Sequence, residues 1–541
     1  MGTVDPLNQD PKRIAKGGVT EKNSQNAHRD VVARLAKHSG HAELYETDIR
    51  MHSLQTGGTV KEKVNFLLPY EEFDTIYEHH NVKHFTSVAP GSGLDDTIGK
   101  WKDACSFSRD EDLIGIGIWG DIAPAFHRNG LAILLWNVVT GCIHDRYPIV
   151  AFSKLLLCQC GCRGRCTYED IFRVVLFVLI AWKTGEYPAI RDDGVPFSES
   201  KRPGDAKRAM WARHNRKMKA KGGCVQKRSD WAWTKQVLGL TGWRGEGPDS
   251  RMCFKCGATK DGPRSFRDTS ASAGWRPTMI DTRTFIKTIL SAGKFLSVVF
   301  QWPGFQTLGL VLIQADLMHT GCLGVVQYVC GNILYELFLE LGGVYSNPLQ
   351  TMCILETYIR QASKAVGLKQ SALIHLTIGM IKAEGRKAPK LKAKAAESRH
   401  VLKCVCHILE THHQPKTPYE ELRYNCVKNL ANFYDELCDW KPGISNTDAT
   451  KYAHRHLIMY TELGRIHLKK ADWQDNGWFM YRWYPKHHLF CHVVEDQIKS
   501  CDNPRDHWCY GDESFIGEMA TVAESVGPTV MHRSVITKYR L

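Results

Sequence analysis

A mostly apolar run that leads into an aspartate constrains this chain most. Residues 307–315 run up to Asp316, and His319 follows three positions later. Such a short run between polar residues predicts a buried strand, and the apolar spacing over residues 323–340 predicts a helix after it. An aspartate where a strand leaves the core is held rigidly with its oxygens facing a cleft, which suits a divalent metal. The alternative for Asp-x-x-His alone is a helix N-cap followed by a histidine on the helix surface.

The chain is too long to fold around one core. Its 541 residues predict two or three packing units, and a content of 43% hydrophobic and 24% charged residues is typical of globular proteins. The formal net charge of +14 suits a polyanionic partner such as nucleic acid. Residues 1–25 contain no apolar signal segment, and the apolar stretch 295–315 is interrupted by Pro303 and Gly304. We therefore expect two short strands around a turn in this stretch, and no membrane-spanning helix.

Three apolar runs after residue 112 predict an antiparallel meander of strands. They cover residues 113–121, 131–139 and 146–157, and the first run ends in Gly120-Asp121. Asp121 is therefore a second candidate acid at the end of a strand. The alternative for this residue is a turn position after a glycine.

Two groups of cysteines indicate metal binding. The chain has nineteen cysteines and no visible secretion signal, which favours metal ligation or burial over disulfides. Cys253 and Cys256 form a C-x2-C knuckle. Structural zinc takes four thiolate or imidazole ligands in a tetrahedron, so we expect these two cysteines to share a zinc with two members of an earlier cluster. Reduced thiols without a metal are the alternative, and which two earlier members would ligate stays open. The earlier cluster comprises Cys158, Cys160, Cys162 and Cys166.

Two basic stretches predict contacts with DNA phosphates. Residues 201–228 and 382–399 carry many lysines and arginines, and four tryptophans lie in or just after the first stretch. Basic residues mixed with aromatic residues suit phosphate contacts and base stacking. A solvated basic helix followed by a packed tryptophan cluster is the alternative. The residues of these stretches that we expect to contact DNA are Arg213, Arg216, Lys217, Lys219, Lys392 and Lys394.

The C-terminal region of the chain supplies a third candidate acid. Residues 483–492 bring Lys486, His488 and His492 close together in the sequence. Further on, Glu513 opens an amphipathic helix that we expect to run to about residue 526, because its apolar residues have helical spacing. A carboxylate in the first turn of a helix also suits the helix dipole, which is the structural alternative for Glu513.

Taken in order, these motifs resemble DDE/D transposases of the cut-and-paste class, closest to the CACTA (En/Spm) and Plavaka or Kyakuja-Dileera-Zisupton groups. The resemblance rests on Gly120-Asp121, on the Asp-Leu-Met-His motif at 316–319 before a hydrophobic helix, and on the blocks 488–496 and 508–517. It covers residues 112–530 as an ordered set of short motifs. The surroundings of Asp121 depart from the longer motif of the plant groups, so Asp112 and Asp145 remain alternatives for the first acid.

The resemblance implies a fold, a chemistry and a partner. The implied fold is α/β, with an RNase H-like core (a mixed sheet flanked by helices) interrupted by a cysteine-rich insert and a long helical insert. Asp121, Asp316 and Glu513 would hold two Mg²⁺ or Mn²⁺ ions about 3.5–4 Å apart for DNA strand cleavage and strand transfer. His319 would orient Asp316 or contact the scissile phosphate. We expect a nuclear homo-oligomer that acts on transposon ends and target DNA, with no membrane partner. The further residues expected to contact DNA are Lys486, His488 and His492.

Two alternatives stay open beside this interpretation. The first is a transposase relative with the same fold that binds DNA without cutting it. The second is a zinc-stabilised nucleic-acid-binding or scaffold protein in which the acids are helix caps and turn residues. The expected order is a polar N-terminal region (1–105, of which 1–60 is mobile or loosely helical), a first core segment (106–157), a cysteine-rich basic insert (158–275), a second core segment (276–344), a helical insertion (345–480) and a third core segment (481–541).

Overall fold

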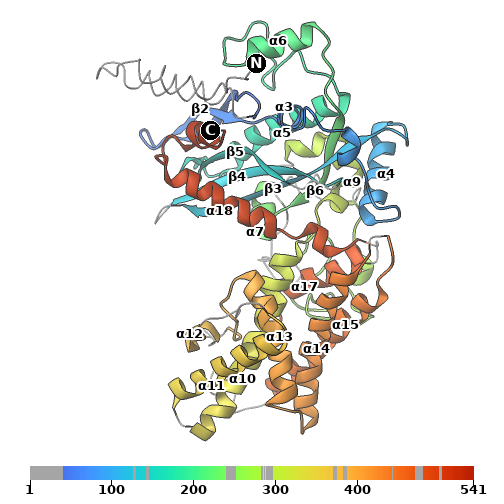
Figure 1. The fold of residues 1–541 in the computed structure, drawn as a ribbon, viewed down its shortest axis with the longest axis vertical. Coiled ribbons are helices and arrows are strands. Elements are labelled where there is room, and N and C mark those ends of the chain that lie inside the picture. The colour runs from blue at the N-terminus through green and yellow to red at the C-terminus, as the bar shows by residue number, and fades with distance from the viewer. Residues whose placement is uncertain are drawn as a thin grey trace, which may run out of the picture. The chain divides into compact units, whose positions relative to one another are not determined.

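The protein, seen in a computed structural model, divides into two compact units (Figure 1). Unit 1 comprises Met1–Thr86, Asp112–Gly223 and Ser514–Leu541, and unit 2 comprises Ser87–Glu111 and Cys224–Glu513. Both units combine segments that are far apart in the sequence, in line with a chain too long for one core. The structure describes residues 40–125, 129–141, 145–238, 240, 251–281, 284–285, 287, 297–345, 347–368, 375–381, 387–441, 443–469, 479–498 and 502–540.

A mixed sheet of four strands, in the order β5-β4-β3-β6, follows residue 112. The strands β3 (Leu113–Ala125), β4 (Asn129–Val138) and β5 (Arg146–Ser153) form the predicted antiparallel meander. β6 (Lys221–Arg228) is the fourth strand, and the chain passes from unit 1 to unit 2 within it. Asp121 pairs with Ile133 in the interior of β3, so this acid lies within a strand and not at its end as predicted.

An antiparallel hairpin precedes the sheet and corrects the prediction for residues 1–60. β1 (Tyr45–His52) pairs with β2 (Thr59–Phe66) along its whole length. In β1 every second side chain is buried, which is the pattern of a strand with one face on a core. Polar residues on the other face gave this segment the composition of a mobile one. The portion of the prediction that concerns residues 1–39 lies outside the described residues.

Helices cover the strands of unit 1. α5 (Arg165–Thr184) packs against β1, and α19 (Met531–Tyr539) packs against β2 and β5. α5 ends at Gly185, whose φ of 71° is the left-handed conformation that terminates many helices. The other described helices that lie wholly within unit 1 are α3 (Pro69–Ile76), α6 (Asp205–Arg213) and the short 3₁₀ turns η3 (Val82–Phe85) and η4 (Lys154–Leu156).

The apolar run before Asp316 is a helix, and the prediction of a strand there is wrong. α9 (Pro303–Leu312) begins with Pro303 in its first turn, and only Ile313 pairs with a strand, through an isolated parallel bridge to Lys227. A short apolar run is compatible with a buried helix or a buried strand, and a proline at the start of a helix favours the helix. A 3₁₀ turn, η6 (Val298–Gln301), precedes α9, so the expected pair of short strands is absent from residues 297–315. The helix α4 (Gly93–Cys105) packs against α9.

The helix predicted after Asp316 is confirmed, although its first turns are wider than those of an α-helix. The π-helix η7 (Met318–Val326) continues directly into α10 (Gln327–Tyr345). Within the described residues, Met318–Gly342 is the one helix long and apolar enough to cross a membrane, and 78% of its apolar window is buried inside the structure. Buried core helices of soluble proteins have the same properties, so this helix is weak evidence for a membrane span.

The described part of residues 345–480 is mostly helical, and the prediction that it forms an insertion stays a prediction. The helices α10, α11, α13, α14 and α15 pack together in unit 2 (Figure 1). Asn347 caps α11, and the Thr417–Glu420 capping box starts α14. Beyond α10, the helices are α11 (Pro348–Ala365), α12 (Ile378–Ile381), α13 (Ala395–Thr411), α14 (Pro418–Asp439) and α15 (Thr447–Leu468).

The C-terminal segment adds short helices and returns the chain to unit 1. The predicted amphipathic helix is α18 (Tyr510–Glu524), and the boundary between the units falls between Glu513 and Ser514 inside it. The other elements of unit 2 are α7 (Trp231–Leu238), η5 (Arg276–Thr278), α17 (Pro485–His492), the π-turn η8 (Val493–Gln497) and η10 (Pro504–His507).

Candidate functional site

Asp316 lies at the start of η7, where its carboxylate caps the helix. Its Oδ1 accepts hydrogen bonds from the backbone N–H groups of Met318 and Cys509, each at 3.0 Å. Its Oδ2 accepts one from the N–H of His319 at 2.8 Å and lies 2.6 Å from Nδ1 of the same histidine. Two donors therefore approach each oxygen, and the side chain is buried.

The second side of the His319 ring faces another acid. Its Nε2 lies 3.6 Å from Oε1 of Glu513, whose side chain is about one third exposed. Burial lowers the pKa of His319, but the hydrogen bond and charge of Asp316, together with the charge of Glu513, raise it above the ordinary value for histidine. Asp316, His319 and Glu513 thus form one chain of interacting groups in unit 2.

The geometry gives Asp316 a positioning role, and its role as a metal ligand stays a prediction. An ionised carboxylate offers about four lone-pair sites, and four N–H or imidazole groups occupy those of Asp316. Protein donors therefore already surround its oxygens, although Asp316 is also among the residues that line the pocket described below. Asp316 fixes the orientation of His319, while the Nε2 of His319 and the carboxylate of Glu513 are the groups directed outward. The oxygens of Asp316, the ring of His319 and the thiol of Cys509 lie within 4.8 Å of one another, a spacing that could hold a metal ion if these hydrogen bonds were exchanged.

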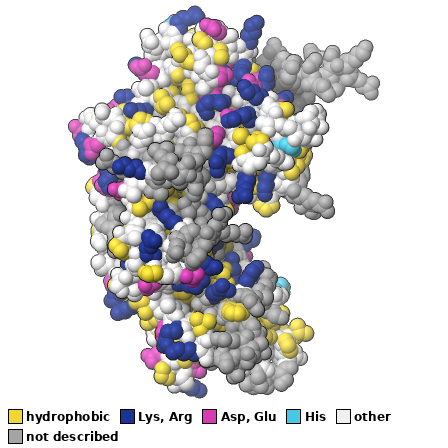
Figure 2. Space-filling model, turned by 180° about the vertical axis from the view of Figure 1, so that it is seen from behind, with side chains coloured by type: hydrophobic (Ala, Val, Ile, Leu, Met, Phe, Trp, Pro, Cys, Tyr) yellow, Lys and Arg dark blue, Asp and Glu magenta, His cyan; other side chains and the backbone are white. Residues whose placement is uncertain are grey.

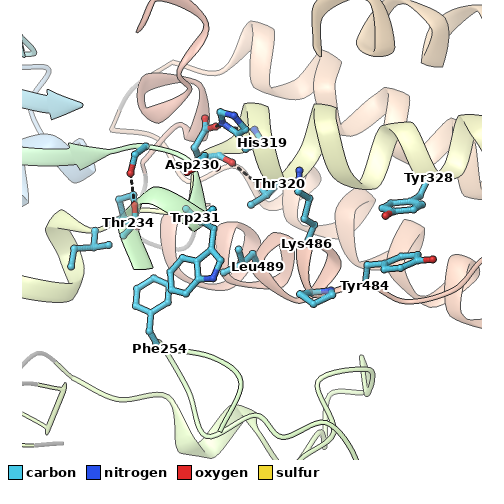
Figure 3. A pocket seen from close by; sticks show the side chains of 17 residues that line it. Asp230, Trp231, Thr234, Phe254, His319, Thr320, Tyr328, Tyr484, Lys486 and Leu489 are labelled. Carbon is cyan, nitrogen blue, oxygen red and sulfur yellow. Dashed lines mark hydrogen bonds and ion pairs between the residues drawn. The ribbon is translucent and has the colours of Figure 1, made fainter. Parts of the chain in front are cut away.

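A pocket of about 320 Å³ lies beside His319 in unit 2 (Figure 3). Two stacked aromatic pairs form much of its wall. Trp231 and Phe254 have ring centroids 4.4 Å apart and planes 20° apart, and Tyr328 and Tyr484 are 4.3 Å and 12° apart. Flat aromatic faces next to a cation are typical of sites that stack nucleic-acid bases. The lining also includes Ser229, Asp230, Thr234, Asp316, Thr320, Pro485, Lys486 and Leu489.

Asp230 is a pocket acid that the sequence analysis missed. It follows β6 directly, and its Oδ1 accepts a hydrogen bond of 2.7 Å from the N–H of Trp233 at the start of α7. The parallel bridge between Lys227 and Ile313 brings the segment before Asp230 beside the segment before Asp316. The signal was present as an aspartate at the end of a strand, but the lysines and arginine of β6 made the strand look like a stretch of solvated basic residues.

Lys486 is the cation of the pocket. Its Nζ donates a hydrogen bond of 3.0 Å to the carbonyl of Leu323 in η7. Burial and the positive charge of Lys390 lower its pKa to about 8, while the charges of Asp230 and Asp316 act in the opposite direction. Gly324 permits this approach, because a Cβ there would lie 2.9 Å from the Lys486 side chain. The contact of Lys486 with DNA stays a prediction.

The predicted first acid lies in unit 1. Asp121 is half-buried on β3, and its Oδ1 accepts a hydrogen bond of 2.7 Å from the N–H of Ile122. Its alternatives, Asp112 and Asp145, are exposed residues just before β3 and β5. The membership of Asp121 in one site with Asp316 and Glu513 stays a prediction.

The knuckle cysteines find partners other than those predicted. Cys253 and Cys256 lie with His488 and His492 of α17, and one ligand atom from each of the four side chains falls within 4.8 Å of the others. The predicted partners, Cys158, Cys160, Cys162 and Cys166, form a separate group of their own. His488 and His492 are one helical turn apart on α17, so both rings face the same side. That coincidence in space could not be inferred from cysteine spacing alone.

The early cysteines form a local and partly exposed cluster in unit 1. Cys158 is buried, whereas Cys160 is exposed. Burial raises the pKa of the Cys162 thiol, but hydrogen bonds from the N–H of Cys166 and from neighbouring thiols lower it to about 6. The four sulfurs lie close enough to hold a metal ion. Metal binding by this cluster on its own, without Cys253 and Cys256, is thus compatible with the structure.

The residues predicted to contact DNA differ in how accessible they are. Arg213, Arg216 and Lys217 are exposed in unit 1, although Lys217 pairs with Glu186. The Nζ of Lys219 donates hydrogen bonds to the backbone carbonyls of Tyr77 and Glu78. Many Lys and Arg side chains are exposed on the face shown in Figure 2. Lys392 and Lys394 are exposed residues of unit 2.

For two other residues the prediction of DNA contact is wrong. His488 and His492 have no exposed surface, and their rings face Cys256 and Cys253. The basic stretch 201–228 is likewise less available than its composition suggests. Arg208 is buried in a double ion pair with Glu71 and Asp205. A run of positive charge in the sequence therefore includes side chains that serve the core.

Comparison with known proteins adds no family assignment. No protein-family model matches the chain, and no curated protein is significantly similar to it.

Proposed function

We propose that the chain is a transposase-like enzyme that cleaves and joins DNA strands by metal-dependent phosphoryl transfer at the pocket of unit 2. The observation that carries this proposal is the chain Asp316–His319–Glu513, with distances of 2.6 Å and 3.6 Å, beside that pocket. A histidine oriented by a buried carboxylate, with its other nitrogen next to an accessible carboxylate, is a common arrangement around catalytic metals. Asp230 adds a second acid to the same pocket.

The available side chains fit a divalent metal. Glu513 and Asp230 offer carboxylate oxygens, and His319 offers Nε2, a ligand set that suits Mn²⁺ and, through the carboxylates, Mg²⁺. Such ions, when bound, would activate a water or a 3′-hydroxyl and stabilise the leaving oxygen of the scissile phosphate. Asp316 keeps His319 in the tautomer that carries its proton on Nδ1, which leaves Nε2 to act as a ligand. Lys486 supplies a positive charge close to where a phosphate would enter.

The substrate class follows from charge and from the aromatic walls. Exposed cations in both units and a net charge of +14 favour a polyanion, and the stacked pairs Trp231–Phe254 and Tyr328–Tyr484 offer faces for bases. A nuclear homo-oligomer acting on transposon ends and target DNA belongs to the same proposal.

The fold is compatible with this function. A mixed sheet with helices packed on its strands supports an RNase H-like core with a helical insertion between residues 345 and 480.

The decisive experiment compares two glutamates of α18. Glu513→Gln should lower Mn²⁺-dependent cleavage of a labelled DNA duplex by at least about 10²–10³-fold while leaving DNA affinity unchanged, because the amide keeps the shape and removes the charge. Glu518→Gln changes an exposed glutamate of the same helix and should cleave like the unmodified protein. Equal cleavage by the two variants would contradict the proposed role of Glu513.

A relative that binds DNA without cutting it is the second candidate. It is favoured by one observation, which is that the acceptor sites of Asp316 are already filled by four donors. Under this alternative the unmodified protein shifts a DNA duplex in a binding assay but gives no nicked product with Mn²⁺ or Mg²⁺. Cleavage that depends on Glu513 would rule it out.

A further inference from the structure

Four metal-ligand side chains meet in the core of unit 2, away from the acids of the pocket. Cys253 and Cys256 come from a loop, and His488 and His492 from α17, and all four have no exposed surface. The Sγ of Cys253 lies 3.4 Å from Nε2 of His492, and the Sγ of Cys256 lies 3.3 Å from Nε2 of His488. The two sulfurs and two nitrogens lie within 4.8 Å of one another.

We propose that this cluster binds one structural Zn²⁺ ion through Cys253, Cys256, His488 and His492. In a tetrahedral site with Zn–S of about 2.3 Å and Zn–N of about 2.0–2.1 Å, a sulfur and a nitrogen are about 3.5 Å apart. The two S···N distances of 3.4 Å and 3.3 Å match this value. Two thiolates and two imidazoles favour zinc over Mg²⁺ or Mn²⁺, which prefer oxygen ligands.

The surroundings of the cluster are those of a closed zinc site. Oδ2 of Asp496 lies 3.5 Å from Nδ1 of His492, on the side of the ring away from the thiols. Lys255 holds the same carboxylate with its Nζ at 3.1 Å. A carboxylate behind a ligating histidine fixes the ring and strengthens the ligand. Trp275 packs edge-on against the rings of His488 and His492, at centroid distances of 4.7 Å and 5.6 Å, and excludes water from that side.

The four proposed ligands lie next to residues that line the pocket, so the zinc would stabilise the pocket wall. Phe254 lies between the two cysteines in the sequence and lines the pocket, and Lys486 and Leu489 precede and flank His488 on α17 and line it as well. The four ligands thus join the loop that carries Phe254 to the helix α17, and both segments line the pocket. With four protein ligands the ion has no open position, so it holds the walls together and does not enter the chemistry. This inference is independent of what the pocket does.

The experiment measures zinc directly in the full-length protein. Because the early cysteines could also bind metal, the measurements are made in a Cys160→Ser, Cys162→Ser background. That background should contain one zinc per chain by elemental analysis, and adding Cys253→Ser should reduce the content to near zero. Cys491→Ser is the matched control, since Cys491 is a buried cysteine of α17 outside the cluster, and it should keep its zinc. A background without zinc, or equal loss in the control, would overturn the proposal.

A second pair of variants separates ligation from folding. His492→Cys retains a zinc ligand and should keep one zinc per chain, whereas His492→Ala should lose it. Replacement of zinc by Co²⁺ in the background protein should give the visible absorption of a tetrahedral site, with a thiolate-to-cobalt charge-transfer band that weakens in folded Cys256→His. Loss of zinc from both His492 variants, or absence of the cobalt bands, would show that the four side chains do not form a metal site.

Discussion

Two clusters of unit 2 use histidine in opposite ways. In the closed cluster, His488 and His492 face two thiols and have no exposed surface. In the open chain at the pocket, His319 lies between two carboxylates, and one of them, Glu513, is about one third exposed. Four protein ligands with no free position describe a site for stability, while a histidine directed towards an accessible acid and a cavity describes a site for chemistry.

Under the two proposals above, the difference shows which features separate a structural site from a reactive one. The closed cluster takes its histidines from α17 and the open chain takes its histidine from η7, and His488 and His492 are buried whereas His319 is half-buried. The closed cluster has its ligands within reach of one another and no pocket acid among them. The open chain has one carboxylate saturated by protein donors, one accessible acid, Glu513, and a pocket acid, Asp230, nearby.

Neutralising the buried carboxylate of Asp316 should cause a large loss of DNA cleavage. Asp316→Asn places an amide among four donors, so His319 loses its orientation and metal-dependent DNA cleavage should fall on the order of 10⁴-fold. Single-turnover cleavage of a labelled duplex measures this. The control is Asp502→Asn, which alters a second buried Asp–His pair of unit 2, Asp502–His507, and should leave cleavage unchanged. Equal loss in both variants would mean that Asp316 acts only on stability.

The closed cluster should respond to metal removal with a loss of stability. A strong chelator should lower the free energy of unfolding by at least about 4 kcal/mol, because loss of a structural metal leaves buried thiols and imidazoles without a partner. Thermal unfolding followed by fluorescence measures the change. Zn²⁺ should restore the original midpoint and Mn²⁺ should not. The Cys253→Ser variant should be insensitive to the chelator, and a strong response there would assign the effect to another metal.

Another buried histidine of unit 2 has the backbone carbonyl and the thiol of Cys426 as its partners, 2.9 Å and 3.5 Å from its Nδ1. His456 in α15 is fully buried, and its Nδ1 donates to the carbonyl of Cys426 at 2.9 Å. Burial lowers its pKa from 6.5 to about 4. The unfolded chain therefore takes up the proton first as the pH falls, so the stability from this group is complete above pH 6.5 and is lost as the pH falls through the window down to about 4.

The loss over that window should amount to about 3 kcal/mol, from about 1.4 kcal/mol for each unit of pKa shift. Urea unfolding at pH 7 and pH 4.5 measures it. His456→Gln should remove most of this pH dependence, while His375→Gln, which changes an exposed histidine, should not. Unchanged pH dependence in His456→Gln would show that other groups control acid unfolding.

The exposed cysteine cluster should give the smallest effect. Cys160 lies at the surface in unit 1, so Cys160→Ser should change the free energy of unfolding by less than about 0.5 kcal/mol. Urea unfolding with and without chelator measures it. If Cys160→Ser lowered the free energy of unfolding as much as Cys253→Ser does, the exposed cluster would contribute as much to stability as the buried one.

The sequence alone predicted much of the fold because regular periodicity is local. The meander at 113–157, the helix after Asp316 and the helix at Glu513 were all found from apolar spacing. The strand expected at 307–315 is α9, because a short apolar run does not separate the two structures. The hairpin β1–β2 was missed, since its exposed face is polar and its alternation was outweighed by composition.

The candidate sites were predictable only where their residues are close in sequence. Asp316 and His319, and the pair Cys253 and Cys256, were recognised from their spacing. The partners of those cysteines and the pocket acid Asp230 depend on which segments fold against each other, and one sequence does not contain that information. The saturation of Asp316 by Met318, His319 and Cys509 is also a property of three-dimensional packing.

The separation between the halves of the closed cluster has a consequence for how the protein is made. Cys253 and His492 are 239 positions apart, so a ribosome that adds about 5–20 residues per second leaves the two thiols waiting for roughly 10–50 s before their histidines emerge. During that interval the nascent thiols are open to oxidants and to foreign metals. The closed cluster therefore cannot assemble until α17 has been made, and under the proposed zinc site the redox state and zinc supply of the cell at that moment would decide how much of the newly made protein matures.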